Sequence, residues 1–199
     1  METRKNKKFI DEKVKEISKS NLVLDVGGGE PFTKWLSEYK GIFDKCDYKT
    51  MDYDRSTSPD IVGDIHNIPL QNDTVDAIIC NCVLEHVENP ILAVKEMYRV
   101  LKPGGKVFVH VPSIYPYHAR KGHYPDYWRF FDDTIEVLFK EFKVVEMQKR
   151  GGYFKALMFF LPLQHKLRFV IDPLSEFLDN LFGMEKRNTT SGYYIYAVK

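Results

Sequence analysis

The feature that most constrains the fold is a short apolar run that ends in an acid and three glycines, NLVLDVGGG at residues 21–29. A continuous apolar run of this length is typical of a parallel strand that is buried on both faces. Similar runs alternate with helix-like segments along the chain. This alternation predicts an α/β fold in which a mostly parallel sheet carries helices on both faces. Seven strands are expected, at NLVLDVG, YKTMDYD, DIVGD, TVDAIICNCVL, KVFVHVP, KVVEMQK and GYYIYAVK, the last two forming an antiparallel edge hairpin.

Length and composition favour one globular domain. A chain of 199 residues is long enough to bury one full core, which predicts a single domain over residues 1–199. The net charge is +1, so nothing in the charge demands a nucleic-acid or membrane partner. Three cysteines, an odd number, favour a reduced, cytoplasmic protein over a disulfide framework. Residues 1–20 lack the apolar core of a signal peptide and predict a surface helix with Phe9, Ile10, Val14 and Ile17 near one face.

The glycine loop lies where such a sheet binds its ligand, beyond the carboxyl end of the first strand. A dinucleotide-binding G-x-G-x-x-G loop would need glycine at the position of Phe32, and no phosphate-binding G-K-[ST] follows. The remaining pattern is Asp25-x-Gly27-x-Gly29, whose glycines allow a sharp turn and a close approach to a ligand. The acid suits an ammonium or sulfonium better than a pyrophosphate. Pro31 is expected in the first turn of the next helix, where its missing N–H costs little.

Two further acids follow the next two expected strands. Asp52 ends the second strand, where a carboxylate can accept hydrogen bonds from both ribose hydroxyls. Asp64 ends the third, within reach of an adenine amino group. Each acid alone is better explained as a turn or capping residue. Acids at three consecutive strand ends, together with the glycine loop, favour a nucleoside-containing ligand.

Four segments in this order and spacing resemble the class I S-adenosylmethionine-dependent methyltransferases, specifically those with the type-11 methyltransferase domain. The segments are LDVGGGEP, MDYD, GDIHNIPLQNDTVDAIICNCVLEHVENP and RVLKPGGKVFVHVPS, which together span residues 22–113. A further segment, HYPDYWRFFDDTIEVLF, is similar to one in a subgroup associated with sugar or cell-envelope metabolism. The resemblance implies a Rossmann-like class I fold, S-adenosylmethionine as cofactor and S-adenosylhomocysteine as product.

The resemblance also implies the residues that hold the cofactor. The methionine part would lie against the glycine loop, the ribose against a carboxylate, and the adenine between a ring and a turn. The implied residues are Asp25, Gly27, Gly29 and Asn81 for the methionine part, Asp52 for the ribose, and Tyr53, Asp64 and the Ile65 backbone for the adenine.

Methyl transfer to an oxygen would also need a group that accepts the proton of the acceptor. His118 and His123 flank ARKG in a loop on the ligand side of the sheet, and one of them is the candidate base. His110 lies within a strand and is expected to be a hydrogen-bonded structural residue. No close Cys/His cluster suggests zinc, so no metal is predicted. The loop after the fourth strand reads NCVLEH and lacks the Asn/Asp-Pro-Pro-aromatic motif of enzymes that methylate nucleic-acid bases.

These observations predict methyl transfer to a small-molecule acceptor, such as an oxygen of a sugar or cell-envelope precursor. A non-catalytic cofactor-binding protein that acts through a partner stays open, and a nicotinamide-dependent oxidoreductase is disfavoured by Phe32. The apolar stretch at residues 153–182 is expected to form a helical cap over the acceptor pocket. A homodimer surface or a membrane-surface contact are the alternatives. Four residues interrupt the stretch, namely Lys155, Pro162, Lys166 and Arg168, and they argue against a transmembrane span because central cations cost about 2.5–3.5 kcal/mol each.

Overall fold

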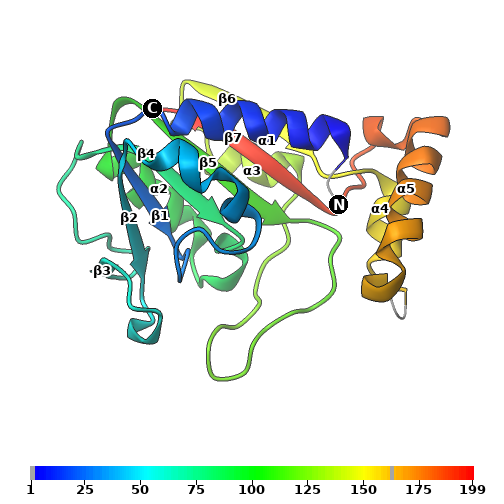
Figure 1. Cartoon of the computed structure of the whole chain (residues 1–199), viewed down its shortest axis with the longest axis horizontal. Coiled ribbons are helices and arrows are strands. Elements are labelled where there is room, and N and C mark those ends of the chain that lie inside the picture. Colours follow the sequence, from blue (N-terminus) through cyan, green and yellow to red (C-terminus); the bar gives the residue numbers. More distant parts are fainter. Residues whose placement is uncertain (1–2, 162–163) are drawn as a thin grey trace.

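A computed structural model describes residues 3–161 and 164–199 and shows the predicted mixed sheet with helices on both faces (Figure 1). The strand order is β3-β2-β1-β4-β5-β7-β6. The first five strands pair in parallel, while β7 is antiparallel to both β5 and β6, which confirms the predicted edge hairpin. The strands are β1 (Leu22–Val26), β2 (Asp47–Asp52), β3 (Ile61–Val62), β4 (Val75–Asn81), β5 (Leu101–Pro112), β6 (Val144–Lys149) and β7 (Gly192–Val198).

Helices cover the sheet in two layers. On one face, α1 (Arg4–Ile17) and the 3₁₀ segment η1 (Lys34–Phe43) pack on the sheet. On the other face lie α2 (Pro90–Val100) and α3 (Asp132–Leu138). The remaining elements are α4 (Tyr153–Met158), α5 (Gln164–Leu181) and the short 3₁₀ turns η2 (Arg55–Thr57), η3 (Leu84–His86) and η4 (Met184–Lys186).

The central strands carry apolar side chains on both faces because both faces are covered. In β4, Ala77 and Ile79 pack toward α1 and η1, while Ile78 and Cys80 pack toward α2. Fully burying one aliphatic side chain stabilises a fold by about 1.5–3 kcal/mol, so these continuous runs fix both layers. The predicted surface helix is α1: Thr3 caps it, and Ile10, Val14 and Ile17 are buried while Phe9 is partly buried.

The segment after the glycine loop differs from the prediction. It forms 3₁₀ turns, and these begin only at Lys34, so Pro31 lies in a turn before the helical segment rather than in its first turn. Phe32 has a φ of +54°, in the left-handed region that favours glycine. Its ring packs on Tyr48 with a centroid distance of 4.4 Å and on Phe43 at 5.7 Å. This packing holds the strained backbone at the position where a dinucleotide-binding loop has glycine.

Helix α2 begins at a capping asparagine followed by a proline. Asn89 caps the N–H of Leu92 and Pro90 opens the helix. Ile91 is 50% exposed, and Leu101 belongs to β5. The buried stripe consists of Pro90, Ala93, Val94, Met97 and Val100, in which alanine and methionine give a weaker periodic signal than isoleucine.

The stretch at residues 153–182 contains two helices beside the end of the sheet (Figure 1). Residues 162 and 163 of this stretch, including the expected interruption at Pro162, lie outside the described residues. The buried carboxylate of Asp179 in α5 accepts N–H bonds from Gly152, Phe154 and Lys155 at 2.9, 2.8 and 3.1 Å, which fixes the start of α4. No helix in the described part of the chain is long and apolar enough to cross a membrane.

Candidate active site

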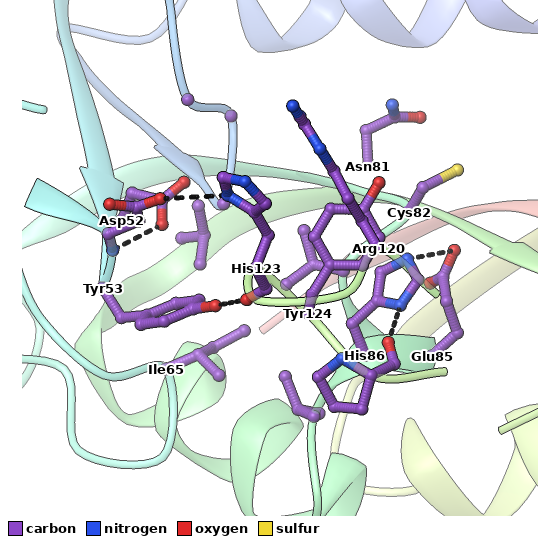
Figure 2. A pocket seen from close by; sticks show the side chains of 18 of the residues that line it. Asp52, Tyr53, Ile65, Asn81, Cys82, Glu85, His86, Arg120, His123 and Tyr124 are labelled. Carbon is purple, nitrogen blue, oxygen red and sulfur yellow. Dashed lines mark hydrogen bonds and ion pairs between the residues drawn. The ribbon is translucent and has the colours of Figure 1, made fainter. Parts of the chain in front are cut away.

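The carboxyl ends of the parallel strands and the loop at residues 113–131 surround a cavity of about 1030 Å³. This volume is at the upper end of small-molecule pockets, which span roughly 300–1,000 Å³. Figure 2 shows Asp52 and Tyr53 on one side of the cavity and Asn81, Glu85 and His86 on the other. Of the predicted cofactor residues, the cavity is lined by Gly27, Gly29, Asp52, Tyr53, Asp64, Ile65 and Asn81.

The glycine loop brings bare backbone to the cavity wall. Gly27 has a φ of +68° and its N–H donates to the carbonyl of Met51 at 2.7 Å. A Cβ at this position would lie 2.5 Å from a methyl carbon of Val83. Gly29 also has a positive φ, of +59°. Gly27 therefore requires glycine by both its φ and its surroundings, and the φ of Gly29 favours glycine.

Asp25 lies beneath this loop and does not line the cavity. Its side chain is buried, and one carboxylate oxygen accepts a 2.7 Å hydrogen bond from the Tyr48 hydroxyl. Burial raises the pKa of Asp25 to about 6, with a smaller contribution from the charge of Asp52, while the Tyr48 hydrogen bond opposes the shift. A Cβ at Gly28 would lie 2.2 Å from Oδ2, the carboxylate oxygen that accepts the Tyr48 bond. The middle glycine thus makes room for Asp25.

The acids predicted for the nucleoside lie at the ends of β2 and β3. Asp52 accepts the N–H of Asp54 at 3.0 Å through one oxygen. The ring of Tyr53 is 61% exposed, and its hydroxyl donates to the backbone carbonyl of His123 in the loop above (Figure 2). Oδ1 of Asp64 accepts the N–H of His66 at 2.9 Å and lies 2.7 Å from Nδ1 of the same histidine. This carboxylate oxygen therefore stabilises the turn that follows β3.

Asn81, at the end of β4, lies next to His110 on β5. Oδ1 of Asn81 and Sγ of Cys82 are both 3.1 Å from Nδ1 of His110. The His110 ring stacks on Tyr194 with a centroid distance of 4.5 Å. His110 is therefore buried and hydrogen-bonded, as expected for a structural histidine, and it fixes Asn81 at the cavity wall.

The structure separates the two candidate bases. His123 lies on the same side of the cavity as Tyr53 (Figure 2), and Nδ1 of its exposed ring is 3.8 Å from an oxygen of Asp54. His118 lies on the other side, with Nε2 3.8 Å from Oε1 of the buried Glu85. The carboxylate of Glu85 raises the pKa of His118 above its usual value, although burial opposes the charge. Both histidines line the same cavity, but the carboxylate beside His118 is buried, whereas His123 lies beside the partly exposed Asp54.

The Nδ1 side of His118 is held by the loop. Nδ1 is 3.1 Å from the carbonyl oxygen of Pro116 and 3.2 Å from Asp126. Asp126 also accepts the N–H of His118 at 2.8 Å and forms a two-point pair with Arg129 at 2.6 and 2.7 Å. Burial raises the pKa of Asp126, but Arg129 and the His118 N–H outweigh it and hold the pKa at about 2. The Asp126–Arg129 pair therefore holds the carboxylate that accepts the His118 N–H, and it orients His118.

The aromatic residues near the end of the loop at residues 113–131 differ in their burial. Phe130 is buried in the core, whereas Tyr127 and Trp128 are exposed. The indole N–H of Trp128 donates to the Val87 carbonyl at 2.9 Å. The N–H groups of Tyr127 and Trp128 both donate to the backbone carbonyl of Glu85, at 2.8 and 3.2 Å. The loop is thereby tied to η3.

The sequence analysis missed Glu85 and His86 as site residues. Both lie in η3, after β4, and face the cavity on the same side as His118. Nδ1 of His86 is 2.5 Å from the Pro125 carbonyl, and its ring packs on Tyr124 at 4.4 Å. The available sequence signal was the adjacent acid and histidine in NCVLEH, directly beyond a central strand.

Residues 24–109 match the family profile described as a methyltransferase domain. This segment, which is less than half of the chain, is therefore similar to a methyltransferase domain family. The fold of the chain resembles that of a SAM-dependent methyltransferase from Archaeoglobus fulgidus, with a TM-score of 0.63 at 14% identity over 98% of this chain and 93% of that chain. It also resembles phosphoethanolamine N-methyltransferase 2 of Haemonchus contortus, solved with phosphomonomethylethanolamine and S-adenosylhomocysteine, with a TM-score of 0.60 at 14% identity over 96% and 52% of the two chains.

A curated protein similar to this chain is the chloroplastic 2-methyl-6-phytyl-1,4-hydroquinone methyltransferase of Spinacia oleracea. The two are 29% identical over 154 residues, which cover 68% of this chain. The chain spans 40% of the length of that relative.

Proposed function

We propose that this chain is an S-adenosylmethionine-dependent methyltransferase that acts on an oxygen of a small-molecule acceptor. The observation that carries the proposal is one continuous cavity with two chemically different sides. One side presents the glycine loop, Asp52 and Tyr53, and the other presents a histidine and a buried carboxylate, His118 and Glu85. A cofactor and an acceptor bound on these two sides would meet inside a single cavity.

The cofactor side fits S-adenosylmethionine in shape and charge. The positive-φ glycines leave room for the methionine part, and Asn81 stands at the end of β4 next to it. Asp52 has an oxygen available for ribose hydroxyls besides the one that Asp54 uses. The exposed ring of Tyr53 offers a face for adenine, with Asp64 and Ile65 at its edge. Asp25 supports the loop from below and does not bind the cofactor directly.

S-adenosylmethionine supplies a methyl group already activated on a sulfonium, so the protein has to align the acceptor and manage its proton. Alignment alone can lower a barrier by several kcal/mol, up to about 7–11 kcal/mol in well-oriented systems. His118 is the better candidate to accept the proton, because its Nδ1 is held by Pro116 and Asp126 and its Nε2 faces the cavity. His123 stands beside the nucleoside side and is the second candidate.

The acceptor side favours a hydroxylated molecule with an acidic group. Arg120 and Arg150 line the cavity, and tyrosine rings form part of its wall. This chemistry suits a sugar or cell-envelope precursor, as expected from the sequence. It also suits a hydroquinone, the acceptor class named for the spinach relative, so both classes belong in the assay.

The two helices at residues 153–182 are proposed to cap the acceptor side. Phe159, directly after α4, packs on Tyr115 with a centroid distance of 4.9 Å. Tyr115 lines the cavity and packs edge-on against His118 at 5.1 Å. The exposed apolar side chains of α5 keep a homodimer or a membrane surface open as alternative contacts. They include Leu167, Phe169, Val170, Leu174, Phe177 and Leu181.

Two measurements test the proposal. Thermal unfolding and calorimetry with S-adenosylmethionine, S-adenosylhomocysteine and NAD should show stabilisation by the first two, since a ligand that binds only the folded state raises its stability. Transfer of isotope-labelled methyl to a panel of sugars, sugar acids and hydroquinones should then identify a methylated product by mass. Stabilisation by NAD alone would overturn the proposal. Cofactor binding without transfer to any acceptor would favour a non-catalytic protein that acts through a partner.

A further inference from the structure

The feature that the proposed cofactor chemistry leaves unexplained is the Glu85 carboxylate. Glu85 is 0% exposed, and neither of its carboxylate oxygens has a hydrogen-bond donor within the described residues. Its backbone is fixed, because its carbonyl accepts the N–H groups of Tyr127 and Trp128. A buried carboxylate without donors is costly unless a positive charge compensates it. The side chain lines the cavity, so the compensating group can come from there.

Two imidazoles face this carboxylate with the same ring nitrogen. Nε2 of His86 and Nε2 of His118 are each 3.8 Å from Oε1 of Glu85. The opposite nitrogen of each ring is anchored to the protein: Nδ1 of His86 at the Pro125 carbonyl, and Nδ1 of His118 at the Pro116 carbonyl. A carbonyl can only accept, so each Nδ1 carries a proton, and in its neutral form each ring directs an Nε2 lone pair toward Glu85. A cation at this point would then lie between two lone pairs and an anion.

We infer that Glu85, His86 and His118 bind a divalent transition-metal ion. One ligand atom from each residue lies within 4.8 Å of the others. Metal–nitrogen and metal–oxygen bonds of about 2.0–2.2 Å place two ligands of a tetrahedral ion about 3.4 Å apart, so the 3.8 Å contacts need to close by less than about half an ångström. Anchoring of the non-ligating nitrogen to a carbonyl or carboxylate is the usual outer-shell arrangement of metal-binding histidines.

The ligand set also selects the kind of ion. Two imidazoles and one carboxylate suit Zn²⁺ and the neighbouring divalent ions, whereas Mg²⁺ and Ca²⁺ prefer oxygen ligands. Three protein ligands leave at least one coordination position open, which is the pattern of sites that bind a water or a substrate oxygen. Because all three residues line the cavity, the open position would face it. An ion at this position would be able to bind an oxygen of the methyl acceptor. This role in acceptor binding rests on the proposed methyltransferase function, whereas the metal site itself does not.

The sequence analysis predicted no metal because Glu85-His86 and His118 are separated by more than thirty residues. The loop at residues 113–131 folds back on η3 and brings them together. Its anchor points are the Tyr127 and Trp128 N–H bonds to Glu85 and the Asp126–Arg129 pair. The cluster is therefore a product of tertiary structure.

The test is metal binding by the full chain after removal of bound ions with a chelator. Titration with Zn²⁺ by calorimetry should show about one tight site per chain. Co²⁺ should give the visible absorption bands of a four- or five-coordinate ion instead of the weak bands of the hydrated ion. The variants Glu85→Gln, His86→Gln and His118→Gln should each weaken Zn²⁺ binding by roughly 100-fold or more, because each removes one of three ligands. The matched control is His123→Gln, which removes an imidazole from the same cavity outside the cluster and should leave binding unchanged.

Absence of Zn²⁺ and Co²⁺ binding to the wild-type chain would overturn the inference, and this outcome does not depend on how the variants fold. Wild-type binding that survives in both Glu85→Gln and His118→Gln would also overturn it, since the ion would then lie elsewhere. The result is separable from the proposed function. If Zn²⁺ binds but S-adenosylmethionine does not stabilise the protein, the metal site stands and the proposed methyltransferase function is wrong. If S-adenosylmethionine stabilises the protein but no metal binds, the proposed function stands and the metal site is wrong.

Discussion

The hydroxyl of Tyr48 donates a 2.7 Å hydrogen bond to Oδ2 of Asp25, beneath the glycine loop. The other carboxylate oxygen of Asp25 is buried without a hydrogen-bond partner among the described residues. Tyr48 and Asp25 belong to neighbouring strands, and Phe32 packs on the Tyr48 ring. The acid that precedes the glycines thus links β1, β2 and the loop into one unit. Asp25 therefore supports the shape of the loop.

The first prediction concerns the pH dependence of stability at Asp25. Burial raises its pKa from 3.8 to about 6, so the folded protein binds this proton more tightly than the unfolded chain. The free energy of unfolding therefore falls as pH rises from about 4 to 6, by at most about 3 kcal/mol from this group. In Asp25→Asn the free energy of unfolding should lack this pH-dependent contribution. Urea denaturation at pH 4 and pH 7 should show the stability of wild type relative to Asp25→Asn decreasing toward pH 7. A difference that stays constant between the two pH values would contradict a raised pKa.

The second prediction concerns the middle glycine of the loop. Gly28→Ala would place a Cβ 2.2 Å from Oδ2 of Asp25, so the carboxylate has to move and its bond to Tyr48 is lost. We expect a loss of about 1–3 kcal/mol of stability, the usual cost of overpacking. Gly41→Ala is the control, because no atom lies within 4 Å of the Cβ it would add. Equal effects of the two substitutions in chemical denaturation would show that the space at Gly28 does not matter.

The third prediction distinguishes two neighbouring acids. Asp52→Ala should weaken binding of S-adenosylmethionine roughly 10- to 100-fold, because hydrogen bonds to a charged group are worth about 1.5–3 kcal/mol. Asp54→Ala should have a smaller effect, since Asp54 caps the N–H of Ser56 at 2.9 Å and stands 3.8 Å from His123. Calorimetry measures both affinities. The opposite order would move the ribose contact from Asp52 to Asp54.

The fourth prediction tests how α4 is held. Asp179→Ala removes a buried carboxylate that accepts three backbone N–H bonds, those of Gly152, Phe154 and Lys155. We expect a loss of about 2–4 kcal/mol and faster hydrogen exchange at these three amides, because they keep no partner. Asn180→Ala, at an exposed neighbouring position, is the control. Unchanged exchange in Asp179→Ala would show that α4 is fixed by other contacts.

The strands and the glycine loop could be predicted because their signals are local. A continuous apolar run defines a buried strand, and glycine marks a backbone with positive φ, as Gly27 and Gly29 confirm. The 3₁₀ segment after Phe32 could not be predicted in the same way, because the backbone strain at Phe32 is compensated by packing on Tyr48 from another strand.

Only some of the residues around His118 could be predicted from the sequence. His118 was recognisable from its loop, but its partners Glu85 and His86 come from η3, and no local pattern connects the two segments. The sequence likewise treated His118 and His123 as equivalent because they flank the same four residues. In the structure the loop places one beside Glu85 and the other beside Asp54, and this separation arises from tertiary contacts.

The last prediction follows from this separation. His118→Gln should lower methyl-transfer turnover by about 10²–10⁴-fold, whether Nε2 accepts a proton or binds an ion that holds the acceptor. Its affinity for S-adenosylmethionine should stay nearly unchanged, because Glu85, Asp126 and Pro116 surround it on the side away from Asp52. His123→Gln should instead act mainly on cofactor affinity, since His123 contacts Asp54 and its carbonyl accepts the Tyr53 hydroxyl. Steady-state kinetics with the identified acceptor and calorimetry with the cofactor separate the two effects. Full turnover by the variant that lacks both imidazoles would leave alignment of the acceptor as the sole contribution of this loop.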